Sequence, residues 1–311
     1  DISLKYKPYV ENYAPFLAEE IVGISEGAGI SLGEAYLLQV RAEMNHHFMQ
    51  HNECTTFAVD SKGTVDGSPL IGQNADLPEF YREIGVVIEF KPDHDPAHLM
   101  LTPAGQISYI GINDQGMGVF ANYINCQGWR DGLPRYMFSR TALNTTSVKE
   151  AIEVLSNVYR GSARNVIMLD KHDHIVDLEL TPTKVGKISA KNGYLAHTNH
   201  FISPDLLNEE QATGHKLTNS KLRLSRMNQL LEENYGNLSV EKTQEILRDR
   251  ENYPNCICQV PGDELNQAPG KKTQDIITFA SVIAEPSQGR MWIAIGPPNE
   301  YEYRCYEFSS K

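Results

Sequence analysis

The chain has 311 residues, 41% of them hydrophobic, and a formal net charge of −12. This length and composition allow a large buried core and exclude a disordered protein. The negative balance argues against nucleic acid or an anionic membrane as a partner, because neutralising phosphate groups requires clustered Lys and Arg. No run of about 18 apolar residues occurs, so we expect no membrane span.

The first part of the chain, residues 8–51, has a helical pattern. Apolar side chains recur at helical spacing up to the break at Gly27-Ala28-Gly29. Ser31 and Glu34 then form a capping box, in which the Ser31 hydroxyl accepts from the Glu34 amide while the Glu34 side chain reaches back. A second helix is therefore expected to begin there and to run to about His47.

From Cys54 to Asn125 the pattern changes to short apolar runs separated by turn residues, which is typical of strands. Such runs without intervening helices favour an antiparallel sheet. The expected strands are 54–59, a run closed by Gly72-Gln73-Asn74-Ala75-Asp76, and then 85–90, 98–102, 108–113 and 116–122.

Helices and strands alternate in the remainder of the chain. The alternation, without a repeat or a low-complexity linker, indicates an α+β layered sandwich. Helices are expected at 134–143, at 147–158 behind a second capping box of Ser147 and Glu150, at about 220–233 and at 239–248. Strands are expected at 165–169, 175–180, 194–198, 276–284 and 291–295.

Cys54 begins one expected strand, and the polar residues Asn74 and Asp76 end the next one. This arrangement is typical of a nucleophile with polar residues that orient it. A free cysteine has a pKa of about 8.5, so it needs a base or a positive field to react as a thiolate at neutral pH. If the Glu53–Cys54 peptide bond were cleaved, the new α-amino group, with a pKa of about 7.7 to 8.0, would supply that base.

Histidine is the usual alternative base. His46, His47 and His51 lie just upstream of Cys54, and the spacing of His47 and His51 places them on one helix face. Solvated positions are the simpler interpretation, so a histidine-assisted hydrolase is the weaker alternative. The other four of the five cysteines are interpreted as buried or loop thiols, because none has the spacing of a zinc pair. They are Cys126, Cys256, Cys258 and Cys305.

Several short motifs, kept in a fixed order over nearly the whole chain, resemble the acyl-coenzyme A:6-aminopenicillanic acid acyltransferase family of N-terminal-nucleophile hydrolases. The resemblance implies a four-layer αββα sandwich and a precursor that cuts itself before Cys54. It divides the chain into a helical pro-segment or α-subunit, 1–53, and a catalytic domain, 54–311. The motifs are Ser25-Glu26-Gly27-Ala28-Gly29, Cys54-Thr55-Thr56, Gly72-Gln73-Asn74-Ala75-Asp76, Asn113-Asp114-Gln115-Gly116-Met117-Gly118, Asn122, Gly132-Leu133-Pro134-Arg135, Thr198-Asn199-His200-Phe201 and Gly296-Pro297-Pro298.

The same resemblance implies roles for single residues. Cys54 would be both the autoproteolytic and the catalytic nucleophile, and Asp76 would hold the freed α-amino group. Asn122 and Asn199 match asparagines that serve the oxyanion, a task suited to a side-chain amide. Arg223 matches an arginine near the nucleophile, where positive charge favours the thiolate.

Two further positions concern processing and the pocket. Ser162 matches a serine linked to cleavage of the precursor. Glu53 stands where the penicillin enzyme has glycine, which bears on the rate of self-cleavage, and Ala75 stands where many relatives have an aromatic side chain, which bears on the pocket and its acyl preference. Taken singly, each residue also has a structural explanation, such as an Asx turn for Asp76, and it is their order that favours catalysis.

The expected reaction is acyl transfer through a Cys54 thioester, from a small-molecule acyl amide or acyl thioester to water or an amine. Amide hydrolysis is the favoured everyday activity, and we expect no bound cofactor and no metal. The alternatives are a ceramidase-like or bile-salt-like lipid amidase, and an uncleaved, non-enzymatic binding protein in which residues 1–53 plug the pocket. The sequence leaves the compartment and the oligomeric state open.

Overall fold

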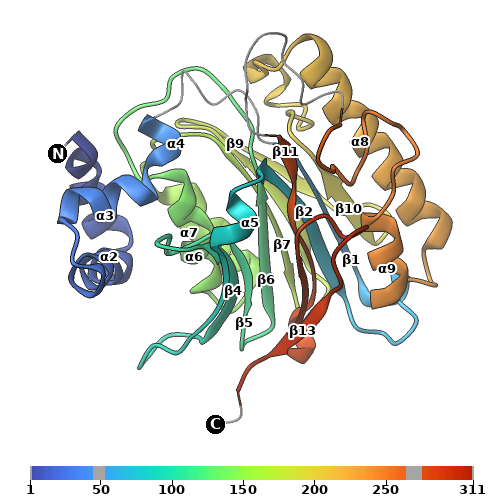
Figure 1. The fold of residues 1–311 in the computed structure, drawn as a ribbon, viewed down its shortest axis with the longest axis horizontal. Coiled ribbons are helices and arrows are strands. Elements are labelled where there is room, and N and C mark those ends of the chain that lie inside the picture. Colours follow the sequence, from blue (N-terminus) through green and yellow to red (C-terminus); the bar gives the residue numbers. More distant parts are fainter. Residues whose placement is uncertain (1, 45–52, 264–274, 310–311) are drawn as a thin grey trace.

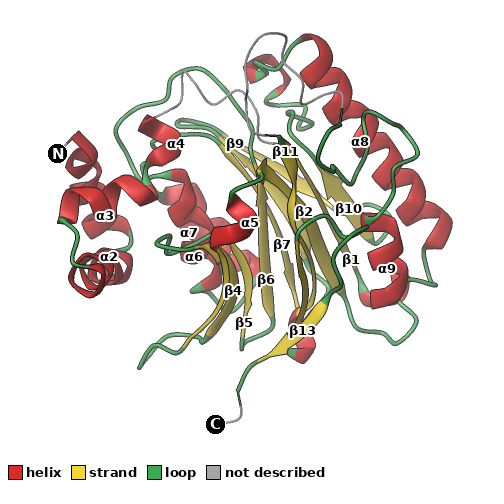
Figure 2. Cartoon of the chain, viewed as in Figure 1, coloured by secondary structure: helices red, strands yellow, loops and turns green. Residues whose placement is uncertain are grey.

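The structure is a computed structural model that describes residues 2–44, 53–263 and 275–309. Two antiparallel sheets stack face to face, and helices cover the outer face of each sheet (Figure 1, Figure 2). This arrangement is the four-layer αββα sandwich that the sequence predicts. None of the described helices is both long and apolar enough to cross a membrane.

The N-terminal helices follow the predicted pattern up to Gln39. Gly29 ends one of them in the left-handed conformation, and both bonds of the Ser31–Glu34 capping box are present. The expected second helix ends earlier than predicted, at Gln39, and its predicted end at His47 lies outside the described residues, as do His46 and His51. The elements are a 3₁₀ turn (Ile2–Tyr6), α1 (Lys7–Tyr13), α2 (Pro15–Ala28), α3 (Leu32–Gln39) and α4 (Arg41–Met44).

Four further helices cover the outer faces of the two sheets. α6 and α7 lie on one side of the molecule with the N-terminal helices beyond them, and α8 and α9 lie on the other side (Figure 1). Ser147 caps α7 as predicted, although Glu150 bonds to Thr146 and so completes no capping box. Their bounds are α6 (Arg135–Leu143), α7 (Val148–Asn157), α8 (Gly214–Asn234) and α9 (Val240–Leu247).

The first sheet contains the strand that begins beside Cys54. Its strands pair antiparallel in the order β10-β1-β2-β11-β12-β13. In the register of β1 with β2, Cys54 lies opposite Ala75 and Glu53 lies opposite Asp76. The strands are β1 (Glu53–Val59), β2 (Leu70–Pro78), β10 (Tyr194–His197), β11 (Ile276–Glu285), β12 (Arg290–Ile295) and β13 (Arg304–Glu307).

Alternation along β2 explains why its motif is polar although it is buried. Gln73 Nε2 donates to the Ala121 carbonyl of the second sheet at 2.9 Å, whereas Asn74 Nδ2 donates at 2.8 Å to a carbonyl at the end of α9. Because successive strand side chains point to opposite faces, Asp76 shares the outer face with Asn74. The buried amide groups are thus satisfied on both sides of the sheet.

The second sheet is a meander in which the strands pair in chain order from β3 to β9. Hairpins join its strands except between β6 and β7, where α6 and α7 intervene. The strands are β3 (Gly85–Phe90), β4 (His98–Pro103), β5 (Ile110–Asn113), β6 (Met117–Asn122), β7 (Arg164–Asp170), β8 (Ile175–Leu180) and β9 (Val185–Ser189).

The sequence analysis missed the edge strands β9 and β13 and the short helix α5 (Tyr81–Ile84). β9 contains Gly186 and Lys187, residue types that are depleted in strands, and most side chains of β13 are exposed. Cys305 lies exposed on β13 and not in a loop, whereas Cys126, Cys256 and Cys258 are buried, as expected. Three 3₁₀ turns complete the described elements: Ser61–Gly63, Leu207–Glu209 and Pro286–Gln288.

Three large apolar cores hold the layers together, beside a small cluster around Phe201. One lies between the two sheets, one under α8 and α9, and one under α6 and α7. The N-terminal helices belong to the third core, where Leu17, Ile21 and Tyr36 are fully buried. Since burial of one such side chain contributes about 1.5–3 kcal/mol, the N-terminal segment is an integral part of the fold and not a loose leader.

Candidate active site

Cys54 lies at one end of the layer between the two sheets. Its side chain is 3% exposed and lines a small cavity of about 10 Å³, which has room for about one water molecule. The cavity brings together side chains from both sheets and from the start of α6. They are Cys54, Leu77, Tyr109, Ala121, Tyr123, Arg135, Tyr136 and Arg164.

The surroundings of the Cys54 thiol keep it protonated. Burial raises its pKa to about 11, and the nearby Asp76 carboxylate acts in the same direction. The Asp76 backbone amide, Arg223 and Gln73 favour the thiolate and lower the pKa, but they do not outweigh burial. In the uncut chain the thiol therefore has no activating base of its own among these neighbours.

The backbone on both sides of the Cys54 α-carbon is held by side chains. The Cys54 N–H donates to Asn199 Oδ1 at 2.7 Å, and Arg223 Nη1 donates to the Cys54 carbonyl at 2.6 Å. Arg223 Nη2 also donates to Asn199 Oδ1, at 2.9 Å. Two of the predicted site residues thus meet at the backbone of Cys54, Asn199 at the Glu53–Cys54 peptide bond and Arg223 at the Cys54–Thr55 peptide bond.

Asn199 and Arg223 are themselves fixed. Arg223 is fully buried on α8 and donates to Asn219 Oδ1 at 2.7 Å and to Thr55 Oγ1 at 2.9 Å. The Asn199 backbone N–H donates to Ser220 Oγ at 2.8 Å, so α8 positions both residues. The N–H groups of the Arg223 guanidinium thus donate to four oxygens, those of Asn219, Thr55, Asn199 and the Cys54 carbonyl.

Asp76 is fully buried at the end of β2. Its Oδ1 accepts a bond of 2.6 Å from Thr278 Oγ1 on β11. The strand register places it opposite Glu53, next to the peptide bond that the sequence predicts to be cut. That Asp76 holds a new amino group on Cys54 stays a prediction.

Asn122 lies deeper between the sheets. Its Nδ2 donates to Thr56 Oγ1 at 2.9 Å and to the His197 carbonyl at 3.0 Å, so both amide protons have acceptors. Its neighbours Ala121 and Tyr123 line the Cys54 cavity, whereas Asn122 does not. An oxyanion role for Asn122 requires it to give up one of these bonds, and that role stays a prediction.

Ser162 does not line the cavity either. It is fully buried and donates to Glu43 Oε1 on α4 at 2.6 Å, and the same oxygen accepts from the Arg135 backbone N–H at 2.8 Å. Ser162 therefore joins the body of the protein to the segment that precedes Cys54.

Sequence reasoning missed Arg164 and the three tyrosines of the cavity, and it gave Arg135 no role although the motif that ends at Arg135 was recognised. Arg164 opens β7 and Tyr109 precedes β5, so the two are far apart in the chain. Nothing in one sequence marks an arginine that points inward. Only the packing of the two sheets brings these side chains to Cys54.

A buried charged cluster supports the loop that carries Asn199. His197 Nε2 lies 2.8 Å from Glu179 Oε1 and 3.8 Å from Asp177 Oδ2. Glu179 also accepts the backbone N–H groups of Ile202, at 2.6 Å, and Ser203, at 3.1 Å. The Glu179 carboxylate thereby fixes the backbone at Ile202 and Ser203, which follow Asn199 in the chain.

Three ligand atoms of this cluster lie within 4.8 Å of one another, a geometry that suits a metal ion. Burial acts to lower the pKa of His197, but Asp177 and Glu179 outweigh it and raise this pKa to about 9. His197 Nδ1 also lies 2.8 Å from the Thr198 carbonyl, so both ring nitrogens have acceptors. A charged imidazolium fits the two carboxylates without a metal ion.

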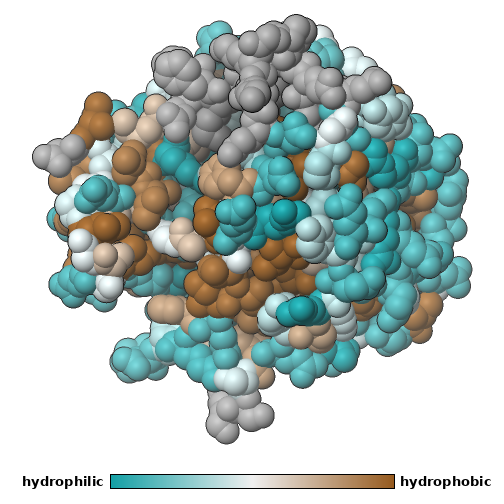
Figure 3. Space-filling view, viewed as in Figure 1, coloured by the Kyte–Doolittle hydropathy of each residue, from teal (hydrophilic) through white to brown (hydrophobic). Residues whose placement is uncertain are grey.

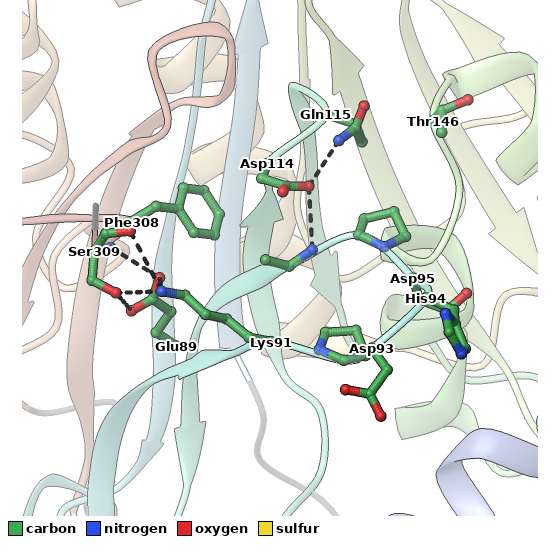
Figure 4. A pocket seen from close by; sticks show the side chains of 13 residues that line it. Glu89, Lys91, Asp93, His94, Asp95, Asp114, Gln115, Thr146, Phe308 and Ser309 are labelled. Atoms are coloured by element: carbon green, nitrogen blue, oxygen red, sulfur yellow. Dashed lines mark hydrogen bonds and ion pairs between the residues drawn. The ribbon is translucent and has the colours of Figure 1, made fainter. Parts of the chain in front are cut away.

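A larger hollow lies elsewhere (Figure 4). It has a volume of about 610 Å³ and is lined by residues such as Lys91, Asp93 and Asp114, with the C-terminal Phe308 on one side. β5 runs from the Tyr109 end of the sheet to Asn113, next to this hollow, so it lies at the opposite end of the strands from Cys54. No cysteine is among the residues that line it.

The fold is that of the N-terminal-nucleophile hydrolases, as three solved structures show. A variant of conjugated bile acid hydrolase from Clostridium perfringens has a TM-score of 0.55 at 15% identity, covering 82% of this chain and 97% of its own. The N-acylethanolamine-hydrolyzing acid amidase ortholog of Caenorhabditis elegans has a TM-score of 0.53 at 14% identity, covering 82% and 100%. Penicillin V acylase from Agrobacterium tumefaciens has a TM-score of 0.52 at 12% identity, and the match covers 78% of this chain and 83% of that protein. At these identities the likeness shows the fold alone.

Sequence comparison gives the family. The family model described as acyl-coenzyme A:6-aminopenicillanic acid acyl-transferase matches residues 64–300. The 40 kDa form of acyl-coenzyme A:6-aminopenicillanic-acid-acyltransferase from Emericella nidulans is 31% identical over 250 residues, which cover 79% of this chain and 67% of that protein. The chain belongs to this family of acyltransferases and amide hydrolases. The family match begins after Cys54, so the case for the nucleophile depends on the geometry around it.

Proposed function

We propose that the chain is a self-processing cysteine amidohydrolase or acyltransferase in which Cys54 is the nucleophile. The observation that carries the proposal is the pair of hydrogen bonds at the Cys54 backbone: its N–H donates to Asn199, and its carbonyl accepts from Arg223. The Cys54 side chain itself lines a cavity. A cysteine that served packing alone would not need a buried arginine on its carbonyl.

In the first step, Cys54 Sγ attacks the carbonyl carbon of Glu53. A C–S bond forms, the C–N bond of the peptide breaks, and the thiol proton passes to the departing nitrogen. Asn199 Oδ1, which accepts the N–H of this nitrogen in the uncut chain, stays bonded to the new amine. Water then cleaves the thioester, which leaves a carboxyl group on Glu53 and restores the thiol. The products are the 1–53 segment and the 54–311 domain.

In the mature enzyme, the Cys54 α-amino group takes the proton of its own thiol, which is the N-terminal variant of triad logic. Asp76 and Asn199 hold this amine. The thiolate attacks an acyl amide or thioester, the amine returns its proton to the leaving group, and water or an amine takes the acyl group. Asn199, which donates one amide proton to the Tyr123 carbonyl, is the proposed oxyanion donor. Asn122 becomes a second oxyanion donor only if its Nδ2 gives up its bond to Thr56 or to the His197 carbonyl.

The cut N-terminal segment is proposed to stay bound as a subunit. Arg140 Nη2 of α6 donates to Glu20 Oε1 at 2.6 Å, and Ser162 donates to Glu43. These bonds and the buried apolar residues of α2 and α3 do not involve the Glu53–Cys54 bond.

A lipid amidase is the second candidate. Figure 3 shows apolar surface between α5 and β13, and β12 and β13 carry a groove of about 250 Å³ with Ile295 and Tyr306 in its lining. Cys54, Ala75, Ala280 and Ile295 occupy one row across the sheet, a span of about 14 Å at the usual strand spacing. Ala75 and Ala280 are fully buried, so an acyl chain reaches the groove along this row only if the second sheet moves away from it.

The activity is tested with amides of one amine and acyl chains from two to sixteen carbons. Hydrolysis that is abolished in Cys54→Ala is the expected result, and the chain length with the highest kcat/KM separates a small-amide enzyme from a lipid amidase. If no amide or thioester is turned over and iodoacetamide fails to label Cys54 in the folded protein, the binding-protein alternative holds instead.

A further inference from the structure

Two arginines line the Cys54 cavity without the partners that buried arginines need. Arg135, at the start of α6, is 3% exposed, and Arg164, at the start of β7, is 1% exposed. In each of them Nε and Nη1 are buried and have no hydrogen-bond acceptor within the described ranges. Leaving buried guanidinium donors without an acceptor is strongly unfavourable unless a ligand supplies one.

Other buried arginines of the same chain are provided with oxygens. Arg140 bonds to Glu20 and to a backbone carbonyl, Arg160 donates to several carbonyls, and Arg223 meets four oxygens. Among the residues whose side chains the structure describes, which do not include Glu53, no ion pair joins a carboxylate to Arg135 or Arg164. Arg41, Arg140 and Arg290 each have a buried Nε without an acceptor as well, but among the described residues only Arg135 and Arg164 also have a buried Nη1 without one.

Aromatic faces take the place of acceptors. The Arg164 guanidinium lies 5.0 Å from the Tyr136 ring centre and 5.9 Å from that of Tyr109, and Arg135 lies 4.7 Å from that of Tyr123. Arg41 adds a third cation, with Nη2 3.1 Å from the Tyr136 hydroxyl. Such faces attract a cation but do not accept an N–H bond in the plane of the guanidinium, so the in-plane N–H donors of both residues, which line the cavity, stay without an acceptor.

The charge of this cavity is positive at neutral pH. Burial and the nearby Arg135 lower the pKa of Arg164 to about 10, so Arg164 keeps its proton. Burial acts to raise the pKa of Tyr136, but Arg41, Arg135 and Arg164 outweigh it and lower this pKa. Two like charges beside one thiol make a site for an anion, and a planar guanidinium fork suits a carboxylate.

We propose that Arg135 and Arg164 form a subsite for a carboxylate of the substrate, so that the enzyme acts on acyl amides or thioesters that carry this group close to the scissile bond. The proposal rests on the proposed function and narrows its substrate class. Because both arginines share one small cavity with Cys54 Sγ, the carboxylate lies only a few bonds from the scissile carbonyl. The cavity of the uncut chain is too small for such a molecule, so binding belongs to the cut enzyme.

The test compares substrates that differ only in charge. N-hexanoylglycine against N-hexanoylglycinamide places the carboxylate on the amine side, and glutaryl 4-nitroanilide against its terminal carboxamide places it on the acyl side. In at least one pair, kcat/KM for the anion is expected to exceed that for the neutral partner by tenfold or more. Arg164→Met and Arg135→Met should each reduce this ratio at least tenfold, and Arg164→Lys should reduce it less.

Lys149→Met, which removes a positive charge from the exposed face of α7, is the matched control and should leave the ratio unchanged. A ratio near one for both pairs in the wild-type enzyme overturns the proposal. So does an unchanged ratio in whichever arginine variant folds.

Failure of the proposed function itself gives a different result. If the wild-type protein hydrolyses neither member of a pair, binding of the same four compounds to the cut protein is measured by calorimetry, and cutting at Cys54 is checked first by intact mass. Binding of an acid at least tenfold tighter than its amide, lost in the Arg164→Met or Arg135→Met protein, still supports the subsite. Equal binding of acid and amide overturns it.

Discussion

Arg223 illustrates how much of the candidate site depends on one side chain. Its fork donates to the Cys54 carbonyl, to Thr55 and to Asn199, and its Nε donates to Asn219. The resemblance to the acyltransferase family predicts that Arg223 lies near the nucleophile. The bond to the Cys54 carbonyl follows only from the packing of α8 on β1.

Arg223→Lys is expected to slow self-cleavage and amide hydrolysis, because a lysine ammonium cannot occupy all four acceptors. Loss of a bond to a charged group costs about 1.5–3 kcal/mol, so the rate should fall by roughly 10- to 150-fold. The rate of fragment formation in a gel time course measures this. Lys221→Met, on the exposed face of the same helix, is the control, and equal rates in all three proteins would refute the role of Arg223.

At the scale of elements, sequence reasoning succeeded where local signals are strong. Alternation and turn residues predict β1, β6 and β8, and hydroxyl caps predict α3 and α7. The start of α8 is six residues earlier than about 220, because Thr213 makes no side-chain capping bond that would have marked it. Local signals also do not place Arg164 beside Tyr136, since that contact depends on the stacking of two sheets.

The loop after β10 is expected to lose support as the pH rises. The pKa of His197 is raised from 6.5 to about 9, so its contribution to stability is complete below pH 6.5 and is lost as the pH passes through 9. The free energy of unfolding, measured with urea at pH 6 and at pH 9.5, should fall by on the order of 1–3 kcal/mol.

His197→Gln should remove most of this pH dependence. His172→Gln, at the exposed turn between β7 and β8, should keep it. If the free energy of unfolding falls equally between pH 6 and pH 9.5 in the wild-type and His197→Gln proteins, His197 does not titrate in this pH range.

At the scale of the whole molecule, the proposed retention of the N-terminal segment after a cut at Cys54 depends on its buried apolar side chains. Ile21 is fully buried in the core under α6 and α7, whereas its neighbour Val22 is 39% exposed. Ile21→Ala should cost about 2–5 kcal/mol and should release the 1–53 fragment from the cut enzyme more readily. Size-exclusion chromatography of the cut protein checks this, and Val22→Ala is the control. Equal retention of the fragment in both variants would contradict the proposed subunit.

The architecture of the whole molecule was predictable because the motifs occur in family order, and the comparisons confirm the family and the fold. The roles of Cys54, Asp76 and Asn199 remain proposals that the geometry supports. The charge of the cavity was not predictable, because Arg135 and Arg164 belong to different elements and meet only in three dimensions.

The central claim is that Cys54 becomes an N-terminal nucleophile, and the intact mass of freshly purified protein under denaturing conditions tests it most directly. The account predicts two fragments that meet between Glu53 and Cys54 in the wild-type protein, and one full-length chain in Cys54→Ala. A single uncut chain in the wild-type protein, or the same two fragments in Cys54→Ala, would contradict it.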